Sequence, residues 1–205
     1  MKSLIIIGAG GHGRVIADIA QKSKKYKKIG FLDDNALGEC LGFPILGKVS
    51  EMKNFIGKAD LFVAIGNNLA RQKFIEELLE LGASVPTLIH PSAIIGSGVC
   101  IDKGTAVMAG AIINPCAKIG KGVIINTCSS VDHDCVVHDY AHIAVGVNVA
   151  GTVVLGERAW IGAGATIKNN VSISCDAIIG AGAVVVDNIE TAGTYVGVPA
   201  KKIKD

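Results

Sequence analysis

A cluster of polar side chains carries the residue types that proton transfer requires. It reads Asn126-Thr127-Cys128-Ser129-Ser130-Val131-Asp132-His133-Asp134-Cys135, and it is followed by His138 and His142. Three of the five histidines therefore fall within ten residues. A neutral imidazole has a pKa near neutrality and suits a general base. Because His133 is bracketed by Asp132 and Asp134, it is the strongest candidate of the three.

A second group of candidate residues lies near the N-terminus. Gly8, Gly10 and Gly13 satisfy the pattern G-x-G-x-x-G after the apolar residues 4–7, and two acidic residues follow about twenty residues later. Such glycines let backbone N–H groups approach a diphosphate at the positive end of a helix, and a carboxylate can accept hydrogen bonds from a ribose or a base. The pattern predicts a nucleotide-diphosphate site, with contacts from Gly10, Gly11, His12, Asp33 and Asp34. In the alternative interpretation, the glycines serve only a tight turn.

Alternating apolar segments predict the strands and helices that position this second site. Strands are expected at residues 4–7, 28–32, 61–65 and 85–89, and helices at 13–22 and 71–81. Together they predict a small Rossmann-like α/β domain over residues 1–88. Gly66 and Asn67 follow the third strand at the carboxyl edge of the sheet, where ligands bind in such folds, so they are candidate sugar or uracil contacts.

The His133 cluster lies within a strict repeat of six residues. An aliphatic residue occurs at every sixth position from Ile89 to Val185, and the residue four positions later is mostly small. A period of six fits neither an amphipathic helix nor an alternating strand. Residues 89–205 are therefore expected to form a parallel β-solenoid whose successive hexads fill one interior. Glycines at 96, 120, 156, 162 and 180 are expected at corners with unusual backbone angles.

The overall composition argues against several classes of function. A formal net charge of +2 and the lack of a basic patch argue against nucleic acid and membranes as partners. The six cysteines form no CxxC pair, and the apolar start is too short for a signal peptide, so a cytoplasmic protein with reduced thiols is expected. An NAD-dependent oxidoreductase would need a second half-domain that the repeat leaves no room for.

The double pattern of the repeat resembles the hexapeptide-repeat acyltransferases, whose coil is a left-handed parallel β-helix. Nearly the whole chain is similar to one subgroup, the N-acetyltransferases of nucleotide-activated amino sugars typified by UDP-N-acetylbacillosamine synthesis, with their sialic acid O-acetyltransferase relatives. The resemblance rests on five segments and one histidine: Gly10-Gly11-His12-Gly13, Phe31-Leu32-Asp33-Asp34, Ile65-Gly66-Asn67-Asn68, Asn126 to Cys135, His142, and Gly197-Val198-Pro199-Ala200-Lys201.

The resemblance assigns roles within the polar cluster. His133 matches the general base, Asp134 matches an acidic neighbour that is often Glu, and Asn126 matches a polar active-site residue. Neighbours in a strand normally point to opposite faces, so either Asp134 or Asp132 is the partner of His133. By the same resemblance, acetyl-CoA is the donor and no metal is needed. Its expected contacts are His142, Gly151, Ala163 and Ala181, and Lys168, Lys201 and Lys202 are available for the CoA phosphates.

The resemblance also implies a homotrimer with its sites between subunits. The expected activity is acetyl transfer to the 4-amino group of a UDP-linked, or alternatively GDP-linked, 4-amino-4,6-dideoxy sugar for surface glycan synthesis. O-acetylation of sialic acid is the alternative, although it would leave Gly10 to Gly13 without a purpose. Two other classes share the coil: inert solenoids, and carbonic anhydrases with three histidines on zinc between subunits, for which His133, His138 and His142 are the candidates.

Overall fold

The computed structural model describes residues 2–203. Its chain divides into two compact units, one up to Pro91 and one from Ser92. No helix within residues 2–203 has the length and apolar character needed to cross a bilayer.

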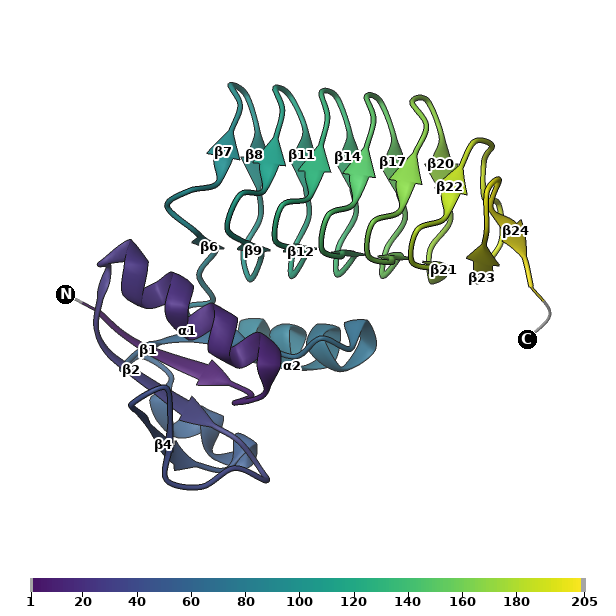
Figure 1. Cartoon of the computed structure of the whole chain (residues 1–205). Coiled ribbons are helices and arrows are strands. Elements are labelled where there is room, and N and C mark those ends of the chain that lie inside the picture. The colour runs from purple at the N-terminus through teal and green to yellow at the C-terminus, as the bar shows by residue number, and fades with distance from the viewer. Residues whose placement is uncertain (1, 204–205) are drawn as a thin grey trace. The chain divides into compact units, whose positions relative to one another are not determined.

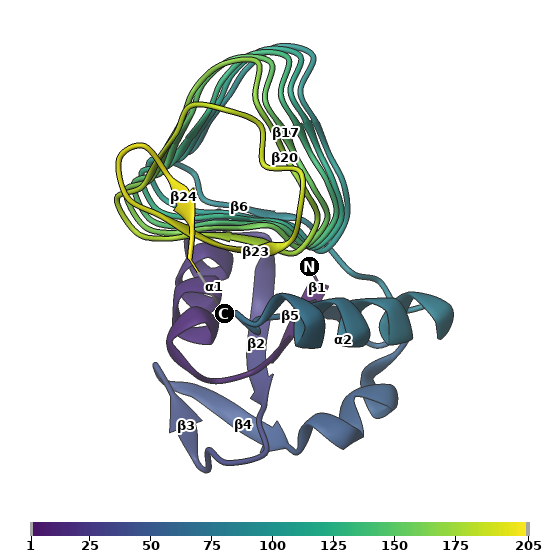
Figure 2. The same cartoon turned by 90° about the vertical axis from the view of Figure 1, so that its right-hand side faces the viewer.

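The first unit is a small α/β domain, as its alternating segments predict. Its five-stranded sheet has the order β3-β4-β2-β1-β5, in which the pairs among β4, β2, β1 and β5 are parallel and β3 joins antiparallel (Figure 1 and Figure 2). The elements are β1 (Lys2–Ile7), α1 (Gly11–Ser23), β2 (Tyr26–Leu32), β3 (Glu39–Cys40), β4 (Phe43–Gly47), the 3-10 helix η1 (Val49–Phe55), β5 (Asp60–Val63), α2 (Asn68–Glu80) and β6 (Leu88–Ile89).

Two elements of this unit differ from the sequence-based expectation. The strand expected at 85–89 is limited to Leu88–Ile89, and the β3–β4 hairpin was not predicted. The hairpin turns through Leu41 and Gly42, which both have positive φ (53° and 75°). That conformation is favoured in two-residue hairpins but is unusual for a leucine, so the sequence carried little signal for it.

The second unit is a left-handed parallel β-helix with three flat faces (Figure 2). The first face comprises β7 (Ile94–Ile95), β10 (Ile112–Ile113), β13 (Ser130–Val131), β16 (Asn148–Val149), β19 (Thr166–Ile167) and β22 (Val184–Val185). The second comprises β8 (Cys100–Ile101), β11 (Lys118–Ile119), β14 (Val136–Val137), β17 (Val154–Leu155) and β20 (Ser172–Ile173). The third comprises β9 (Ala106–Val107), β12 (Ile124–Ile125), β15 (His142–Ile143), β18 (Trp160–Ile161), β21 (Ala177–Ile179), β23 (Gly193–Val196) and β24 (Lys201–Lys202).

Three kinds of three-residue corner join these faces. The first corner joins the first and second faces and includes residues 132–134 and 150–152. The second corner joins the second and third faces and includes residues 138–140 and 156–158. The third corner joins the third and first faces and includes residues 126–128, 144–146, 162–164 and 180–182.

The core of the coil is the predicted ladder. Val131 pairs with Ile113 on one side and Val149 on the other, so equivalent residues are eighteen apart. Every rung from Val107 to Val185 is buried, and the small residues of the second register, such as Ala141 and Ala159, fill the remaining space. The first rungs are less covered, and Ile95 is 37% exposed. The hexad pattern thus predicted the interior correctly from Val107 onwards.

The corner glycines have a different role from the one expected. Gly96, Gly120, Gly156, Gly162 and Gly180 do not have positive φ, whereas the residues two positions later, such as Gly98 and Gly164, do. A Cβ atom on Gly156 would lie 2.6 Å from the carbonyl carbon of Ser174 in the next coil. The expectation of unusual backbone angles at these five glycines is therefore wrong, because the next coil, and not the backbone conformation, restricts them.

This distinction predicts a difference in stability between two substitutions. Gly156→Ala should lower the free energy of unfolding by about 1–3 kcal/mol, since the new Cβ would overlap the backbone of the next coil. Gly164→Asn should be nearly neutral, since a Cβ there meets nothing within 4 Å and asparagine tolerates positive φ. Urea unfolding of both variants and the parent measures the difference. Equal losses would contradict the packing explanation.

Candidate functional site

His133 lies at the middle of the first corner, directly after β13. Its ring is exposed, and its Nδ1 atom lies 2.8 Å from Oδ2 of Asp134. Asp134 has φ of 57°, a left-handed conformation that breaks the alternation of a strand. The corner therefore brings two sequence neighbours onto the same side, and Asp134 is the carboxylate in contact with the imidazole.

Asp132 has a different task. Its Oδ1 atom accepts hydrogen bonds from the backbone N–H of His133 (2.8 Å) and from Nδ2 of Asn114 in the preceding coil (2.7 Å). The Asn114 amide, followed by the His133 N–H, holds the pKa of the Asp132 carboxyl below its usual range. Asp132 thus fixes the corner backbone and contributes negative charge.

These carboxylates determine the proton affinity of His133. The hydrogen bond that Asp134 accepts from the ring, and next the charge of Asp132, raise the pKa of the imidazole above its ordinary value. If Nδ1 carries the proton that Asp134 accepts, Nε2 is left as the free basic atom; this tautomer is assigned from the hydrogen bond. The arrangement can take up a proton at Nε2.

Gly151 occupies the equivalent position in the next coil and is buried beneath the His133 ring. A Cβ atom there would lie 2.6 Å from Nε2 of His133. The backbone N–H of Gly151 donates no hydrogen bond within residues 2–203. Glycine at this position thus leaves room for the ring and places a backbone donor beside it.

Asn126 and His142 form a separate pair at the third corner and third face. Asn126 Oδ1 accepts the N–H of Thr127, and its Nδ2 lies 3.3 Å from Nε2 of His142. Trp160, one coil further, stacks on His142 with ring centroids 5.7 Å apart and an angle of 2° between the planes. Trp160 was not predicted as a site residue. Its position eighteen residues after His142, which is one coil of the repeat, indicates that it lies beside that ring.

A row of small residues continues from Asn126 along the third corner. Ala163 and Ala181 are exposed there, and a Cβ atom on Gly164 or Gly182 would meet nothing within 4 Å. The backbone N–H groups of Ala163 and Ala181 donate no hydrogen bond among the described residues. Beyond Val145, which is 50% exposed in the intervening coil, the corner therefore presents small side chains with free backbone donors.

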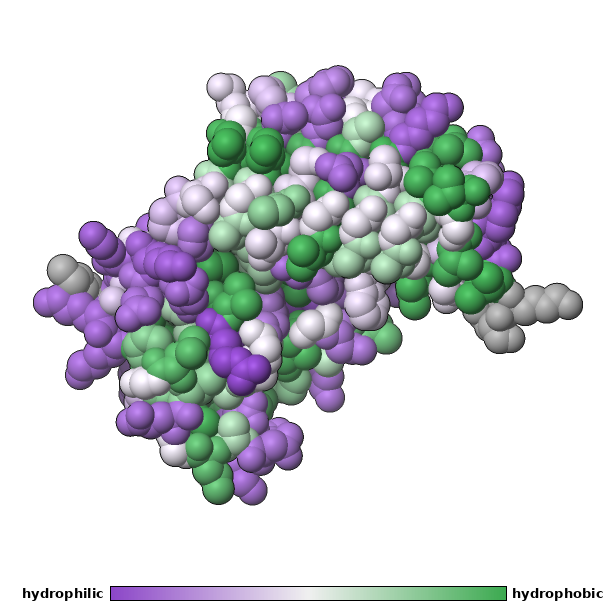
Figure 3. Space-filling model, in the orientation of Figure 1, coloured by the Kyte–Doolittle hydropathy of each residue, from purple (hydrophilic) through white to green (hydrophobic). Residues whose placement is uncertain are grey.

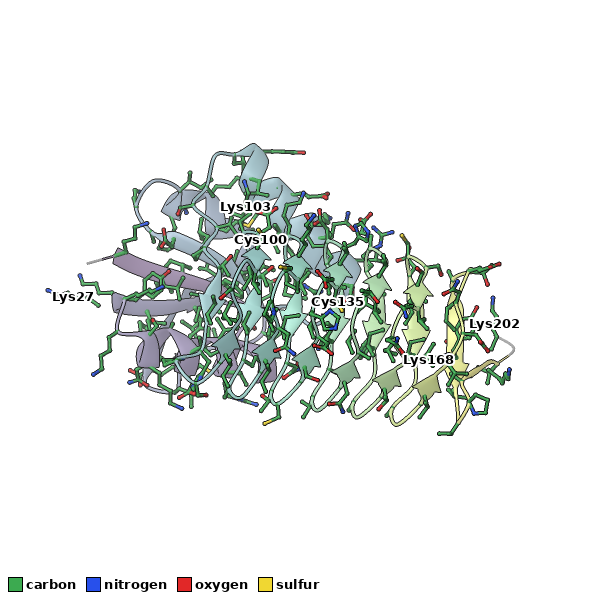
Figure 4. The ribbon with its side chains drawn as sticks, turned by 90° about the horizontal axis from the view of Figure 1, so that it is seen from above. Lys27, Cys100, Lys103, Cys135, Lys168 and Lys202 are labelled. Carbon is green, nitrogen blue, oxygen red and sulfur yellow. The ribbon has the colours of Figure 1, made fainter. Side chains whose placement is uncertain are left out.

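The expected lysines lie near the C-terminal end of the coil. Lys168 is exposed at the first corner, and Lys202 projects from β24 (Figure 4). Lys202 Nζ already donates to the Ala192 carbonyl at 2.8 Å. Lys201 is exposed.

The site residues predicted on the coil thus fall into two groups within one chain. His133, Asp134 and Gly151 share the first corner, whereas Asn126, His142, Ala163 and Ala181 belong to the third corner and third face. His138 lies at the second corner. Within residues 2–203, no group of three or more His, Cys, Asp or Glu side chains is placed to hold a metal ion, so one chain does not bring His133, His138 and His142 together as zinc ligands.

The glycine loop of the first unit is held by Asp33. Its Oδ2 atom accepts the Ala9 N–H at 2.7 Å, and Oδ1 accepts the N–H groups of Asn35 and Ala36. The Ala9 hydrogen bond is the largest cause of the lowered pKa of this carboxyl. Asp34 accepts the Val49 N–H at 3.0 Å. Both predicted acidic contacts are therefore already bonded to backbone, and Asp33 shapes the loop itself.

The three glycines of the motif play different parts. Gly8 has φ of 102°, and a Cβ on Gly13 would overlap the carbonyl of Gly8, so both permit the tight turn into α1. Gly10 and Gly11 are different, because a Cβ on either would meet open space. They lie at the N-terminus of α1, whose positive end faces outward.

His12 and Arg71 connect this loop to the end of β5. Burial, and next the charge of Arg71, lower the pKa of His12 to about 4, so its ring is neutral, and its buried Nε2 has no hydrogen-bond partner in residues 2–203. Arg71 is 1% exposed and donates to the carbonyls of Ile65 and Gly66. Sequence reasoning missed Arg71, because a charged helix residue gives no sign of burial.

Gly66 and Asn67 lie where the third parallel strand ends. Asn67 is the N-cap of α2, and its Oδ1 accepts the Ala70 N–H at 2.9 Å. A Cβ atom on Gly66 would meet nothing within 4 Å, and the Gly66 carbonyl accepts a hydrogen bond from Arg71. Since β2, β1 and β5 are adjacent and parallel, the loops after them share one edge of the sheet.

The first unit matches a known domain family. Residues 3–78 match the model of the PglD N-terminal domain.

Two curated relatives and one solved structure extend the comparison. UDP-N-acetylbacillosamine N-acetyltransferase of Bacillus subtilis (strain 168) is 35% identical over 115 residues, which are 53% of this chain and 52% of that protein, so the match spans about half its length. GDP-perosamine N-acetyltransferase of Escherichia coli O157:H7 is 33% identical over 161 residues, 76% of this chain and 73% of the relative. The acetyltransferase domain of PglB from Neisseria gonorrhoeae FA1090, in complex with acetyl coenzyme A, is 38% identical with a TM-score of 0.96, covering 98% of this chain and 99% of that one.

These matches agree with the resemblance that the sequence motifs indicated. The chain belongs to the family of hexapeptide-repeat sugar N-acetyltransferases that includes the UDP-N-acetylbacillosamine and GDP-perosamine enzymes.

Proposed function

We propose that this protein transfers the acetyl group of acetyl-CoA to the 4-amino group of a nucleotide-linked 4-amino-4,6-dideoxy sugar. The observation that carries the proposal is the His133–Asp134 pair, whose 2.8 Å contact orients a basic imidazole at an exposed corner. The names of the relatives support the reaction type, and the acetyl coenzyme A complex of the gonococcal domain supports the donor.

The chemistry requires one base and no covalent enzyme intermediate. The sugar amine attacks the thioester carbonyl, so an N–C bond forms and the amine must lose a proton. Nε2 of His133 accepts that proton, and Asp134 stabilises the resulting imidazolium. When the tetrahedral intermediate collapses, the C–S bond breaks. The CoA thiolate then takes the proton from Nε2 of His133, and the imidazole becomes neutral again. A positioned base of this kind contributes about 10²- to 10⁴-fold to the rate.

Gly151 is suited to stabilise the oxyanion of that intermediate. Its N–H has no partner in residues 2–203, and the residue adjoins Nε2 of His133. A backbone donor aimed at developing negative charge is worth about 2.7–4 kcal/mol. We assign to Gly151 the donor that faces the acetyl carbonyl.

The third corner supplies the proposed path for acetyl-CoA. Its small residues leave room for a pantetheine arm, and the free N–H groups of Ala163 and Ala181 can donate to the amide carbonyls of that arm. The Asn126–His142 pair, held by the stacked Trp160, is positioned to contact the thioester. Lys168 and Lys201 are exposed and available for the CoA phosphates.

The separation of these groups argues for a site formed by two chains. One chain carries the base at its first corner and the proposed thioester contacts at its third corner and third face, so packing of parallel coils would complete each site with residues from a neighbour. A cyclic trimer satisfies this requirement with three equal interfaces. We therefore propose a homotrimer, acting in the cytoplasm where acetyl-CoA and nucleotide sugars are made.

The first unit supplies the proposed nucleotide site. A diphosphate would accept hydrogen bonds from the N–H groups at the start of α1, where Gly10 and Gly11 allow close approach. The unpartnered Nε2 of the neutral His12 offers one further polar contact, and Gly66 and Asn67 lie along the same edge. The base is uridine or guanosine, since the relatives use one or the other.

A substrate panel tests the proposed function. The protein is incubated with acetyl-CoA and, separately, UDP-, GDP- and TDP-linked 4-amino sugars and sialic acid, while release of free thiol is followed. We expect release with one nucleotide amino sugar and none with sialic acid. Thiol release with sialic acid and not with any amino sugar would replace N-acetylation by O-acetylation.

His133→Ala should lower kcat by about 10²- to 10⁴-fold, because the proton acceptor is lost. The affinity for acetyl-CoA, measured by calorimetry, should change little. His138→Ala is the matched control, since this exposed histidine lies at the second corner, and it should retain the parental kcat. A His133→Ala variant with unchanged turnover would remove His133 as the base.

The pH dependence tests the Asp134 contact. His133 acts as a base only when neutral, so activity rises as pH increases through its pKa, which Asp134 raises. In Asp134→Asn that pKa falls, and the acidic limb of the kcat/KM profile should move to lower pH. A limb that stays in place, or moves to higher pH, would contradict the assignment of Asp134 as the partner of His133.

A further inference from the structure

Apart from the proposed nucleotide site, the first unit contains a pocket that the proposed acetyl transfer does not use. Its volume is about 510 Å³, within the range of small-molecule sites. Ser3, Leu4 and Ile5 of β1 line it, whereas the glycine loop follows the opposite end of the same strand. None of the residues assigned above to the nucleotide or to acetyl-CoA lines this pocket.

A glycine within a strand makes room for one apolar side chain of this pocket, that of Leu46. Gly30 lies in the interior of β2 and pairs with Ile5 of β1, so the two residues belong to the same stretch of sheet. A Cβ atom on Gly30 would lie 2.6 Å from Cδ1 of Leu46. Leu46 therefore packs over Gly30 and forms part of the pocket wall. Leu46 itself is 44% exposed, which leaves a large apolar side chain at the pocket without cover.

The walls of the pocket are apolar and its charges have one sign. Its apolar lining residues come from β1, β2, β4 and η1: Leu4, Ile5, Ile29, Phe43, Pro44, Leu46 and Phe55. Its charged residues are Lys27, Lys28 and Lys58, and no carboxylate lines it.

These three lysines form no ion pair within residues 2–203, unlike Lys2, Lys22 and Lys53 of the same unit. Lys27 extends outward from the surface (Figure 4). Hydrophilic residues also dominate the visible surface of this unit, with smaller apolar areas between them (Figure 3). The pocket is therefore an apolar chamber beside unpaired positive charge.

We propose that this pocket binds a free amphipathic anion, with a medium-length alkyl chain in the chamber and a carboxylate or phosphate between Lys28 and Lys58. The apolar walls do not suit a nucleotide or a sugar, because the polar groups of such ligands would lose hydrogen bonds to water without replacement. The limited volume favours a single chain over a membrane surface. The site is independent of the proposed acetyl transfer.

Calorimetric titration of the full chain with decanoate, below its micellar concentration, tests the proposal. We expect saturable binding of one decanoate per chain. Gly30→Val should weaken it at least tenfold, because the new side chain would push Leu46 into the chamber while a β-branched residue still suits a strand. The double variant Lys28→Glu/Lys58→Glu should also weaken it at least tenfold, and this variant decides the question alone if Gly30→Val fails to fold.

Two controls make the result specific. Lys103→Glu makes the same charge change at an exposed lysine of the second unit and should leave decanoate affinity unchanged. Decanol should bind at least tenfold more weakly than decanoate. No binding of decanoate, equal binding by the Lys28→Glu/Lys58→Glu variant, or binding only to anionic phosphatidylglycerol vesicles would overturn the proposal. Thiol release from acetyl-CoA is measured separately, so failure here leaves the proposed function untouched.

Discussion

The constraint on which the coil depends is the parallel register that places residues eighteen apart directly beside each other. Backbone hydrogen bonds between coils leave each side chain with two fixed neighbours, one in the preceding coil and one in the following coil. The interior satisfies this constraint with aliphatic rungs and small residues. At the corners, the same register determines which side chains can coexist, so a large side chain in one coil restricts the next.

The candidate base illustrates this restriction. His133 occupies space that a side chain on Gly151 would need, and its neighbour Asp134 turns toward it because the corner adopts a left-handed conformation. On the third face, the register places Trp160 against His142. The polar residues of the site thus need no backbone other than the left-handed corners that recur along the coil, and the stacking of the coils orients them. In the first unit, the hydrogen bonds that Asp33 accepts and Arg71 donates hold the loops at the sheet edge in the same way.

Much of this arrangement was predictable from the sequence, and the exceptions have physical causes. The rungs and the polar cluster were visible because each depends on residue type at a fixed spacing. The partner of His133 could not be decided, since it depends on the φ of Asp134, which many residue types adopt at this corner position. The role of Gly156 was misread because its restriction comes from Ser174, eighteen residues away. Burial of Arg71 had no local signal, because its partners are carbonyl groups.

The central claim is that one chain supplies the base and another supplies the contacts to the thioester. Activity of mixed oligomers tests it most directly, using a His133→Ala chain and an Asn126→Ala/His142→Ala chain that carry different tags. If sites form between subunits of a trimer, co-assembly should restore about a quarter of the sites, and activity should rise well above that of either variant alone. Activity of the mixed oligomers equal to the mean of the two variants would show that each site lies within one chain.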